Sequence, residues 1–159
     1  MKPVAWRVGL GFDVHPFTDD PARRLVLAGI ELEGRGLAGH SDADVIAHAV
    51  ADALLGAAGL GDLGGHFPDD DPTWRDADSM DLLARVAAEV SPGWRVGNVD
   101  CAVVLEAPRL APHRDAMQRR LAAIVDAGVS VKAKRAEGLG PLGRGEGIAC
   151  WAVAILESR

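Results

Sequence analysis

The chain has 159 residues, of which 48% are apolar and 25% are charged, and its formal net charge is −6. These values predict one soluble domain over residues 1–159, with enough apolar residues for one sizeable core. The acidic balance argues against nucleic acid as a partner, and the absence of a long apolar run argues against a membrane partner.

Two cysteines, Cys101 and Cys150, both lie in apolar runs. They are expected to be buried free thiols in a reducing compartment rather than a disulfide. The first residues have no long apolar segment behind them, so no signal peptide is expected. A cytoplasmic location is therefore predicted.

Residues 6–15 alternate between two kinds of side chain, which predicts a half-buried strand. One face carries the apolar residues Trp6, Val8, Leu10, Phe12 and Val14. The other face ends in Asp13 and His15, which point the same way and can chelate a metal ion. Gly9 and Gly11 are expected to leave open space on that face. The alternative is a polar strand end that meets solvent.

A short hairpin is predicted over residues 25–32, followed by a loop that leads to a helix. Ser41 and Asp44 have the spacing of a capping box, which predicts that the helix begins there. Apolar residues then recur at helical spacing, and Gly56 and Gly59 weaken and end the pattern.

His48 is expected one turn into this helix. Asp44 and Asp52 lie four residues to either side of it and are expected on the same helix face. Two carboxylates can hold a histidine as a metal ligand or as a base. The alternative is a solvated helix face with one isolated histidine.

Residues 59–72 are rich in glycine and aspartate. Leu63 and Phe67 give this stretch apolar side chains to bury, so an ordered, functional surface loop is predicted. The alternative is an acidic loop that is merely solvated.

The second half of the chain alternates between helices and strands. Helices are predicted over residues 79–90 and 114–127, strands over 94–105, 129–134 and 148–157, and a glycine-rich loop over 137–147. The last strand is apolar on both faces, which places it centrally or at a subunit interface. The predicted fold is α+β: a four-stranded sheet with a short hairpin and helices on one face, whose other apolar face indicates an oligomer.

Seven motifs occur in order over nearly the whole chain. They are Gly11-Phe12-Asp13-Val14-His15, His40-Ser41-Asp42-Ala43-Asp44 through His48, Asp52-Ala53-Leu54-Leu55, Gly61-Asp62-Leu63-Gly64, Phe67-Pro68-Asp69-Asp70-Asp71-Pro72, Gly97-Asn98-Val99-Asp100 and Gly143-Arg144-Gly145-Glu146-Gly147. Together they resemble the 2-C-methyl-D-erythritol 2,4-cyclodiphosphate synthase family of the non-mevalonate isoprenoid pathway. The resemblance implies a homotrimer whose sheets face the threefold axis, with active sites between neighbouring subunits.

The resemblance also implies two metal ions. Asp13, His15 and His48 match zinc ligands, and three such ligands leave a fourth tetrahedral position open, as a catalytic zinc requires. Glu137 matches the ligand of a second metal, magnesium or manganese.

Substrate contacts are implied along much of the chain. They are His40, Ser41, Asp62, Leu63, Gly64, Phe67, Asp69, Asp70, Asp71, Leu105, Arg109, Leu110, Ala111, Ala133, Lys134, Arg135 and Arg144. Among them, His40 and Arg135 are expected to act on the reacting phosphates. Residues 67–71 match a flexible loop over the methylerythritol part of the substrate, and residues 105–111 match the wall for cytosine and its phosphates.

The implied substrate is 4-diphosphocytidyl-2-C-methyl-D-erythritol 2-phosphate. Its 2-phosphate attacks the β-phosphorus, CMP leaves and a cyclic diphosphate forms; this chemistry needs positioning and charge neutralisation above all. Two alternatives remain: a zinc-dependent phosphohydrolase of nucleotide diphosphates, and a non-catalytic trimeric binding module.

The chain departs from the family pattern at three places. Lys134-Arg135-Ala136 stands where threonines are common, Pro141 where an aromatic residue is usual, and Leu105 where a smaller residue is found. Arg135 is expected to reach the diphosphate, because its permanent charge makes a stronger contact than a hydroxyl. The alternative is that the strand has already ended and the side chain turns to solvent.

Arg144 matches a position that faces the threefold axis. Three arginines there need a counter-anion, and an isoprenoid diphosphate is the implied ligand. The alternative is a structural ion pair between Arg144 and Glu146.

Overall fold

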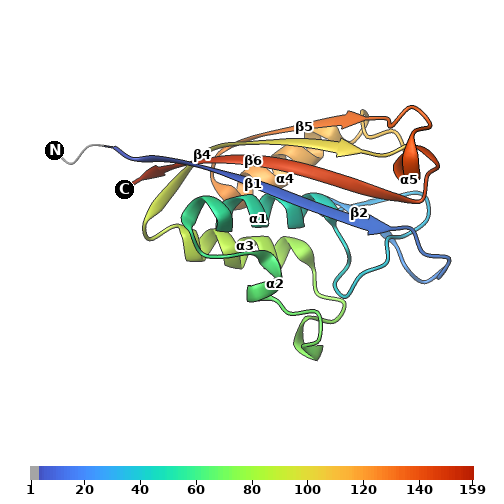
Figure 1. Ribbon diagram of the computed structural model, residues 1–159, viewed down its shortest axis with the longest axis horizontal. Coiled ribbons are helices and arrows are strands. Elements are labelled where there is room, and N and C mark those ends of the chain that lie inside the picture. The colour runs from blue at the N-terminus through green and yellow to red at the C-terminus, as the bar shows by residue number, and fades with distance from the viewer. Residues whose placement is uncertain (1–3) are drawn as a thin grey trace.

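A four-stranded sheet with helices on one face organises the chain (Figure 1). The structure, a computed structural model, describes residues 4–159. The elements are β1 (Trp6–Pro16), β2 (Leu25–Leu27), β3 (Ile30–Leu32), α1 (Val45–Ala58), α2 (Leu63–His66), η1 (Pro72–Trp74), α3 (Ser79–Val90), β4 (Trp94–Val104), α4 (Arg114–Val125), β5 (Gly128–Lys134), α5 (Gly140–Gly143) and β6 (Gly147–Ser158). The predicted α+β class and the predicted hairpin β2–β3 are confirmed.

Strand β6 lies inside the sheet, whose order is β1–β6–β4–β5. It pairs antiparallel with β1 on one side and with β4 on the other, while β4 and β5 are parallel and are connected through α4. The helix-facing residues of β6 are buried in the core, while Trp151 and Val153 point to the uncovered face and are exposed, so burial within this chain explains only one of its two apolar faces. The central position predicted for this strand is confirmed.

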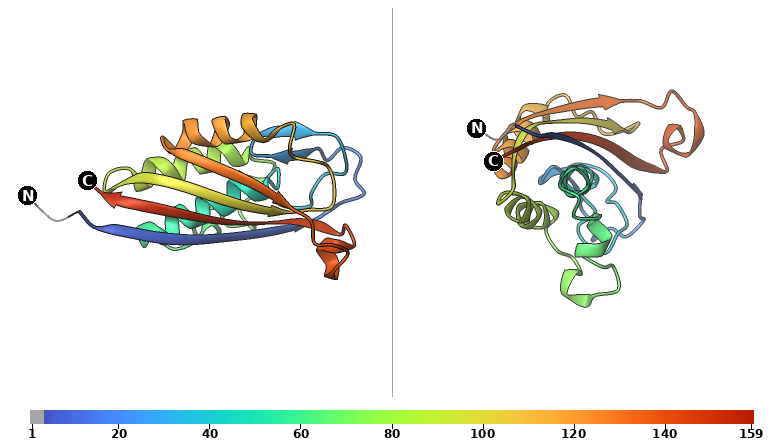
Figure 2. Two further views of the ribbon diagram at one scale, coloured as in Figure 1. Left: turned by 90° about the horizontal axis from the view of Figure 1, so that it is seen from above. Right: turned by 60° about the vertical axis from the view of Figure 1, so that its left-hand side comes forward.

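Helices cover one face of the sheet only (Figure 2). Helix α1 packs directly on β1 at two glycines. A Cβ atom on Gly9 would lie 1.9 Å from the Ala53 carbonyl oxygen, and one on Gly11 would lie 1.9 Å from the Ala49 carbonyl oxygen. The expectation of open space beside these glycines was wrong: they are small because the backbone of α1 occupies that space.

The uncovered face of the sheet is apolar. Strand β1 contributes to it Trp6, Val8, Leu10, Phe12 and Val14, each between 47% and 67% exposed, and β6 contributes Trp151 and Val153. The rings of Phe12 and Trp151 lie 4.9 Å apart across the two strands. Strand β1 is half-buried as predicted, but its buried face is the glycine face and its large side chains point outward. So much exposed apolar surface is typical of a protein interface.

The start of α1 differs from the prediction. Asp44, not Ser41, is the N-cap, and its Oδ1 accepts from the N–H groups of Ile46 and Ala47, both at 3.1 Å. The same carboxylate accepts from the N–H groups of Ala28 and Gly29 in the hairpin turn. One buried side chain therefore fixes both the helix start and the hairpin, a pairing that helical spacing alone does not reveal.

The boundaries of α3 and α4 lie close to the prediction, whereas the short helix α5 lies inside residues 137–147, which were predicted as a loop. Helix α3 begins at Ser79 and ends at Val90, as predicted. Helix α4 ends at Val125, two residues early, because Asp126 adopts a left-handed conformation with φ of 52°. Within residues 4–159 no helix has the length and apolar character needed to cross a membrane.

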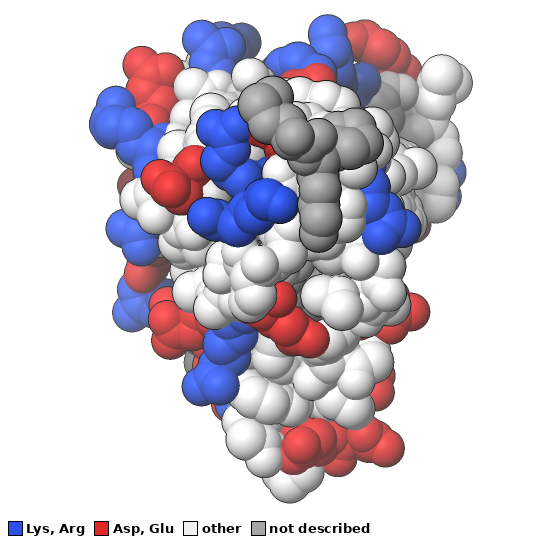
Figure 3. Space-filling view, turned by 90° about the vertical axis from the view of Figure 1, so that its left-hand side faces the viewer, with Lys and Arg blue, Asp and Glu red and all other residues white. Residues whose placement is uncertain are grey.

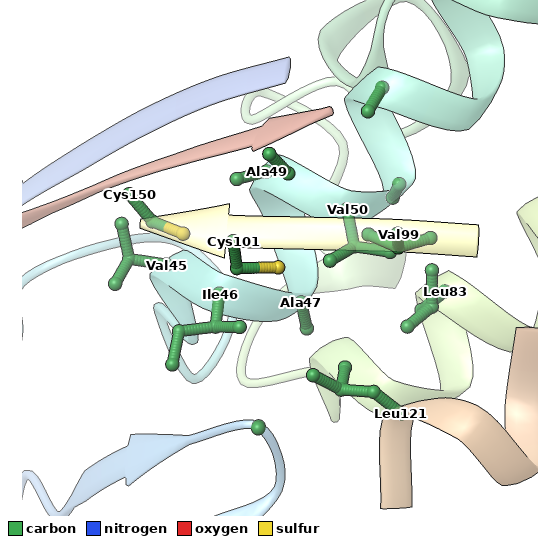
Figure 4. Packing of buried hydrophobic residues seen from close by; sticks show 14 of the residues in the cluster. Val45, Ile46, Ala47, Ala49, Val50, Leu83, Val99, Cys101, Leu121 and Cys150 are labelled. Carbon is green, nitrogen blue, oxygen red and sulfur yellow. The ribbon is translucent and has the colours of Figure 1, made fainter. Parts of the chain in front are cut away.

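The core lies between the sheet and the helices (Figure 4). Cys101 of β4 and Cys150 of β6 are buried free thiols in this core, as predicted. A hydrogen bond with Cys101, together with burial, raises the pKa of the Cys150 thiol well above its ordinary value. A thiol that stays protonated is a poor nucleophile, so this cysteine is expected to be unreactive in the folded protein.

Charges of both signs are mixed on the end of the molecule that carries the chain termini (Figure 3). Basic and acidic groups alternate over this face rather than forming a continuous basic stripe.

Candidate metal centre and pocket

Two residues of β1 and one residue of α1 bring three metal-ligating atoms together. Asp13 Oδ2 lies 2.9 Å from His48 Nδ1 and 3.0 Å from His15 Nε2, and the two histidine nitrogens are 3.4 Å apart. Within residues 4–159 this is the group of three metal-ligating side chains that lies together. The sequence placed Asp13 and His15 on one strand face; the packing of α1 on β1 adds His48.

The outward-facing nitrogens of both histidines are also hydrogen-bonded. His15 Nδ1 donates to the Ala38 carbonyl oxygen at 2.8 Å, and His48 Nε2 lies 2.8 Å from Ser79 Oγ and 3.1 Å from Ser41 Oγ. Such outer bonds fix the orientation of each ring and leave the inner nitrogen for a metal. The ligating atoms of a tetrahedral zinc site are about 3.3 Å apart. The donor set therefore fits a divalent metal ion with an open fourth position.

Ser79 and Asp42 extend this arrangement, and the sequence analysis missed both as functional residues. Ser79 Oγ donates to Asp42 Oδ1, and the Ser79 N–H donates to Asp42 Oδ2 at 3.1 Å. A chain of hydrogen bonds thus runs from Asp42 through Ser79 to His48. The two residues are far apart in sequence, so only the docking of α3 beside α1 brings them together.

The carboxylates predicted to flank His48 have other partners. Asp44 caps α1, and Asp52 Oδ1 accepts from the N–H group of Leu63 at 3.1 Å. The prediction that they hold His48 was wrong, because the imidazole points toward β1. Its carboxylate partner is Asp13, which the strand supplies.

The triad is electrostatically coupled. Burial alone would raise the pKa of Asp13, but hydrogen bonds from His15 and His48 outweigh it and hold that pKa well below its usual range. Burial would lower the pKa of His15, but the Asp13 carboxylate outweighs it and raises that pKa. A metal ion must therefore compete with a proton for His15 when it binds.

A pocket of about 520 Å³, which we call the metal pocket, adjoins the triad. Its other lining residues are Gly39, His40, Ser41, Leu63, Gly64, Phe67, Pro68, Asp69, Asp70, Trp74 and Leu82. His40 Nε2 donates to the Asp71 carbonyl oxygen at 2.9 Å. Ser41 is buried and its hydroxyl faces His48, so it supports a triad histidine.

Two predicted contact residues do not line this pocket. Asp62 is the N-cap of α2 and accepts from the N–H group of Gly65, and Asp71 accepts from the N–H group of Thr73. Both side chains shape the segment between α1 and α3. The predicted surface loop is ordered around the short helices α2 and η1, which the sequence analysis did not foresee.

A second pocket, of about 280 Å³, lies at the ends of β4 and β5. Its lining residues are Leu105, Glu106, Pro108, Arg109, Leu110, Ala111, Ala133, Lys134 and Arg135. Asp13, Cys150, Val103 and Ala133 face one another in successive strands. Three strand spacings separate the first from the last, roughly 14 Å. Most of the predicted site residues therefore fall into two groups, in separate pockets.

Arg135, Glu137 and Arg144 lie outside the metal pocket. Strand β5 ends at Lys134, so Arg135 is an exposed residue just beyond it. Glu137 has φ of 54° and is not part of a metal-ligating group of three within residues 4–159. Arg144 Nε donates to Glu146 Oε1 at 2.6 Å, which is the ion pair considered as the alternative to an anion site.

Known proteins resemble this chain over almost its full length. A sequence model of the YgbB family matches residues 6–157. The chain belongs to the YgbB family. A relative from Rubrobacter xylanophilus, named 2-C-methyl-D-erythritol 2,4-cyclodiphosphate synthase, is 56% identical over 158 residues, covering 96% of this chain and 95% of that protein. The resemblance drawn from the motifs is thereby confirmed.

Some family members are longer. A bifunctional enzyme IspD/IspF from Anaeromyxobacter dehalogenans is 54% identical over 97% of this chain, but the chain spans only 40% of that protein. Among solved structures, the CDP complex of IspF from Plasmodium falciparum is 28% identical, with a TM-score of 0.85 over 98% of this chain and 97% of that one. The family thus includes a protein whose structure was solved with a cytidine nucleotide.

Proposed function

We propose that the chain converts 4-diphosphocytidyl-2-C-methyl-D-erythritol 2-phosphate to 2-C-methyl-D-erythritol 2,4-cyclodiphosphate and CMP, as one catalytic domain in the cytoplasm. The observation that carries the proposal is the Asp13–His15–His48 triad beside a pocket, in a chain that is 56% identical to a relative named for this activity. The CDP complex of the Plasmodium falciparum relative supports a cytidine diphosphate substrate.

The protein's main task in this reaction is positioning. Both reacting groups are phosphates that repel each other, and a zinc ion held by Asp13, His15 and His48 would supply positive charge to offset that repulsion. His40 lies in the wall of the same pocket, where its imidazole is oriented by the Asp71 carbonyl. Phe67 and Trp74 form an apolar part of the wall and would keep water from the diphosphate.

We infer that the complete site forms between subunits of a homotrimer whose sheets face the threefold axis. The two predicted groups of site residues lie in separate pockets of one chain. The uncovered face of the sheet carries exposed apolar side chains of β1 and β6, which association would bury. Cytosine and its phosphates would then occupy the second pocket, at residues 105–111 and 133–135, beside the metal pocket of a neighbouring subunit.

A second metal, magnesium or manganese, is proposed at Glu137. One carboxylate does not make a metal site by itself, but Mg²⁺ is commonly held by one or two carboxylates together with substrate phosphates. Arg135, two residues earlier, is proposed to contact the same phosphates. Both roles therefore depend on bound substrate, and the exposed positions of these side chains are compatible with that.

Arg144 is proposed to face the trimer axis and to hold an isoprenoid diphosphate. Its ion pair with Glu146 is exposed, with side chains 59% and 53% accessible, so it is a weak competitor for a diphosphate. Native mass spectrometry tests the assignment: an axial ligand adds mass to the trimer, and Arg144→Ala should lose it. A trimer free of any ligand would leave Arg144 with the structural role.

The reaction class is tested by running the assay in ¹⁸O-labelled water. A cyclase releases CMP and a cyclic diphosphate with no label in either product, because the substrate's own phosphate is the nucleophile. A phosphohydrolase, the competing function, would place solvent oxygen in one product. Label in the phosphate products would overturn the proposed function.

A further inference from the structure

The segment over residues 60–77 forms one wall of the metal pocket, yet it has little core of its own. Leu63, Gly64, Phe67 and Trp74 from this segment line the pocket. None of the residues in α2 or η1 is fully buried, and only Leu63 and Phe67 of the segment are partly buried against the main core. The position of the rest of this wall must therefore depend on further contacts with the neighbouring helices.

Hydrogen bonds hold the segment on its inner side and at its end. The Leu63 N–H group donates to Asp52 Oδ1 of α1 at 3.1 Å, and His40 Nε2 donates to the Asp71 carbonyl oxygen at 2.9 Å. Near the end of the segment, the Asp76 N–H group donates to the His40 carbonyl oxygen at 2.8 Å, and the Ala77 carbonyl oxygen accepts from the Asp42 N–H group at 3.0 Å. These bonds fix the backbone at the first residue of α2, at the N-cap of η1 and at residues 76–77. None of them holds the side chains of His66 and Trp74.

Two side chains of α3 contact the segment from outside the pocket. Glu89 Oε2 lies 3.2 Å from His66 Nδ1, and the Arg85 guanidinium carbon lies 5.5 Å from the centre of the Trp74 ring. Arg85 and Glu89 are four residues apart, so they lie one turn apart on the same face of the helix. We call this pair the α3 clamp. Neither of its residues lines the pocket.

His66 connects the clamp to the start of the segment. Its Nε2 donates to the Leu60 carbonyl oxygen at 2.8 Å while its Nδ1 faces Glu89. The imidazole is 23% exposed, which shields its contact with the Glu89 carboxylate partly from solvent. One side chain thus links residue 60, α2 and α3.

Trp74 connects the clamp to the apolar wall. The Phe67 ring stands edge-on to Trp74, with centroids 4.9 Å apart and planes at 83°. Edge-to-face aromatic pairs and cations over indole rings are both attractive arrangements. Because Phe67 and Trp74 both line the pocket, the contact of Arg85 with Trp74 affects the shape of the apolar wall.

We propose that Arg85 and Glu89 are positioning residues that hold the 60–77 wall against the pocket before substrate arrives. The proposal rests on the proposed function, because this wall would face the methylerythritol phosphate half of that substrate. If the wall is displaced part of the time, the apparent affinity for substrate falls in proportion to the fraction of molecules whose wall is in place. Loss of the clamp therefore raises KM and leaves kcat unchanged, because chemistry follows once the wall has closed.

Steady-state kinetics of the zinc-loaded full chain provide the first test. Arg85→Ala and Glu89→Ala should each raise KM about two- to threefold, and the double variant about three- to tenfold, since each contact is partly exposed. Arg85→Lys keeps a cation near the ring and should stay within about twofold of the wild type. Arg119→Ala, an exposed arginine of α4, is the matched control and should leave KM unchanged.

Inhibition by CDP separates positioning from general damage. CDP lacks the methylerythritol half and would not reach the 60–77 wall. The inhibition constant of CDP should therefore stay within about twofold of the wild type in both clamp variants. An equal weakening of CDP and substrate binding would overturn the proposal, since it would indicate that the variants disturb the whole site.

Hydrogen exchange of the substrate-free protein tests the clamp independently of the reaction. Amides in residues 60–77 should exchange several-fold faster in Arg85→Ala and Glu89→Ala than in the wild type and in Arg119→Ala. Unchanged exchange would overturn the clamp, and faster exchange with unchanged KM would overturn its positioning role. If the wild-type protein forms no cyclic product, the proposed function fails, while the exchange result still decides whether the clamp exists.

Discussion

The metal pocket and the second pocket of this chain differ in how firmly their side chains are held. In the metal pocket His15 and His48 each use both ring nitrogens, and Asp13 contacts both histidines. In the second pocket, Arg109, Lys134 and Arg135 are exposed. The candidate metal ligands are thus already held in place within one chain, whereas the basic side chains of the second pocket are presented to solvent.

Hydrogen bonds in the second pocket order its backbone and not its basic side chains. The Ala136 N–H group donates to Glu106 Oε1 at 2.8 Å, and the Leu105 N–H group donates to the Lys134 carbonyl oxygen at 3.0 Å. These bonds fix the loops that follow β4 and β5 but leave the basic side chains free. For the proposed reaction, a rigid metal pocket and an adaptable nucleotide pocket would suit the accurate placement of the phosphates.

The largest effect on the proposed site is expected from separating the subunits of the proposed trimer. Leu10→Asp places a charge on the uncovered apolar face, where Leu10 is 65% exposed, and should prevent association without disturbing the core. Sedimentation of the wild type should show three times the 16.6 kDa chain mass, and the variant should be monomeric. The monomer should still bind zinc but show no activity. Full activity in a monomer would contradict a site shared between subunits.

His48→Ala should remove the metal and keep the assembly. Losing one of three ligands should abolish stoichiometric zinc and lower turnover at least roughly a thousandfold, several kcal/mol of transition-state stabilisation. Metal analysis and sedimentation of the same sample check both expectations. A folded trimeric variant with full zinc content would disprove the triad assignment.

Ser79→Ala should weaken metal binding by about ten- to a hundredfold, because it removes the hydrogen bond that orients His48. A chelator competition assay measures this affinity, and the d–d spectrum of the cobalt-substituted protein reports the ligand geometry. Ser130→Ala, an exposed serine of β5, is the control. Equal affinities of the two variants would show that the outer hydrogen bonds do not position the triad.

Arg135→Ala should lower turnover at least tenfold, about 1.4 kcal/mol, if this exposed side chain reaches the diphosphate. The expected effect is smaller than that of the triad because the arginine contacts substrate without holding the metal. Arg119→Ala again serves as the control for loss of one exposed arginine. Unchanged turnover in Arg135→Ala would show that the side chain faces solvent throughout the reaction.

Between about pH 6 and 8, a lower pH should stabilise the metal-free fold but weaken the stabilisation by bound zinc. The lowered pKa of Asp13 gives the metal-free fold a stabilisation that is fully present above about pH 3.8 and is lost as the pH falls. The raised pKa of His15 gives a stabilisation that is fully present below about pH 6.5 and is lost as the pH rises. Zinc needs neutral histidines, so its stabilising effect should grow as pH rises from 6 to 8. Thermal unfolding with and without zinc measures the difference. A zinc effect independent of pH would contradict the coupling.

Local patterns in the sequence determined most of the secondary structure. The spacing of apolar residues gave α3 as residues 79–90, and the two-sided apolar pattern of β6 placed that strand centrally. Alternation along β1 put Asp13 and His15 on one face. These results follow from chemistry repeated over a few neighbouring residues, which the sequence displays directly.

Only the tertiary structure decided which partners these residues have. Asp44 caps α1 and also binds the hairpin turn, Ser79 reaches His48 from another helix, and the glycine face of β1 is buried under α1. Each contact joins segments whose separation along the chain carries no periodic signal. Alternation shows that a strand has two faces, but the packing of helices decides which face is buried. For the same reason the sequence supplied candidate residues for a metal site and for a nucleotide pocket, while the fold places most of them in two separate cavities.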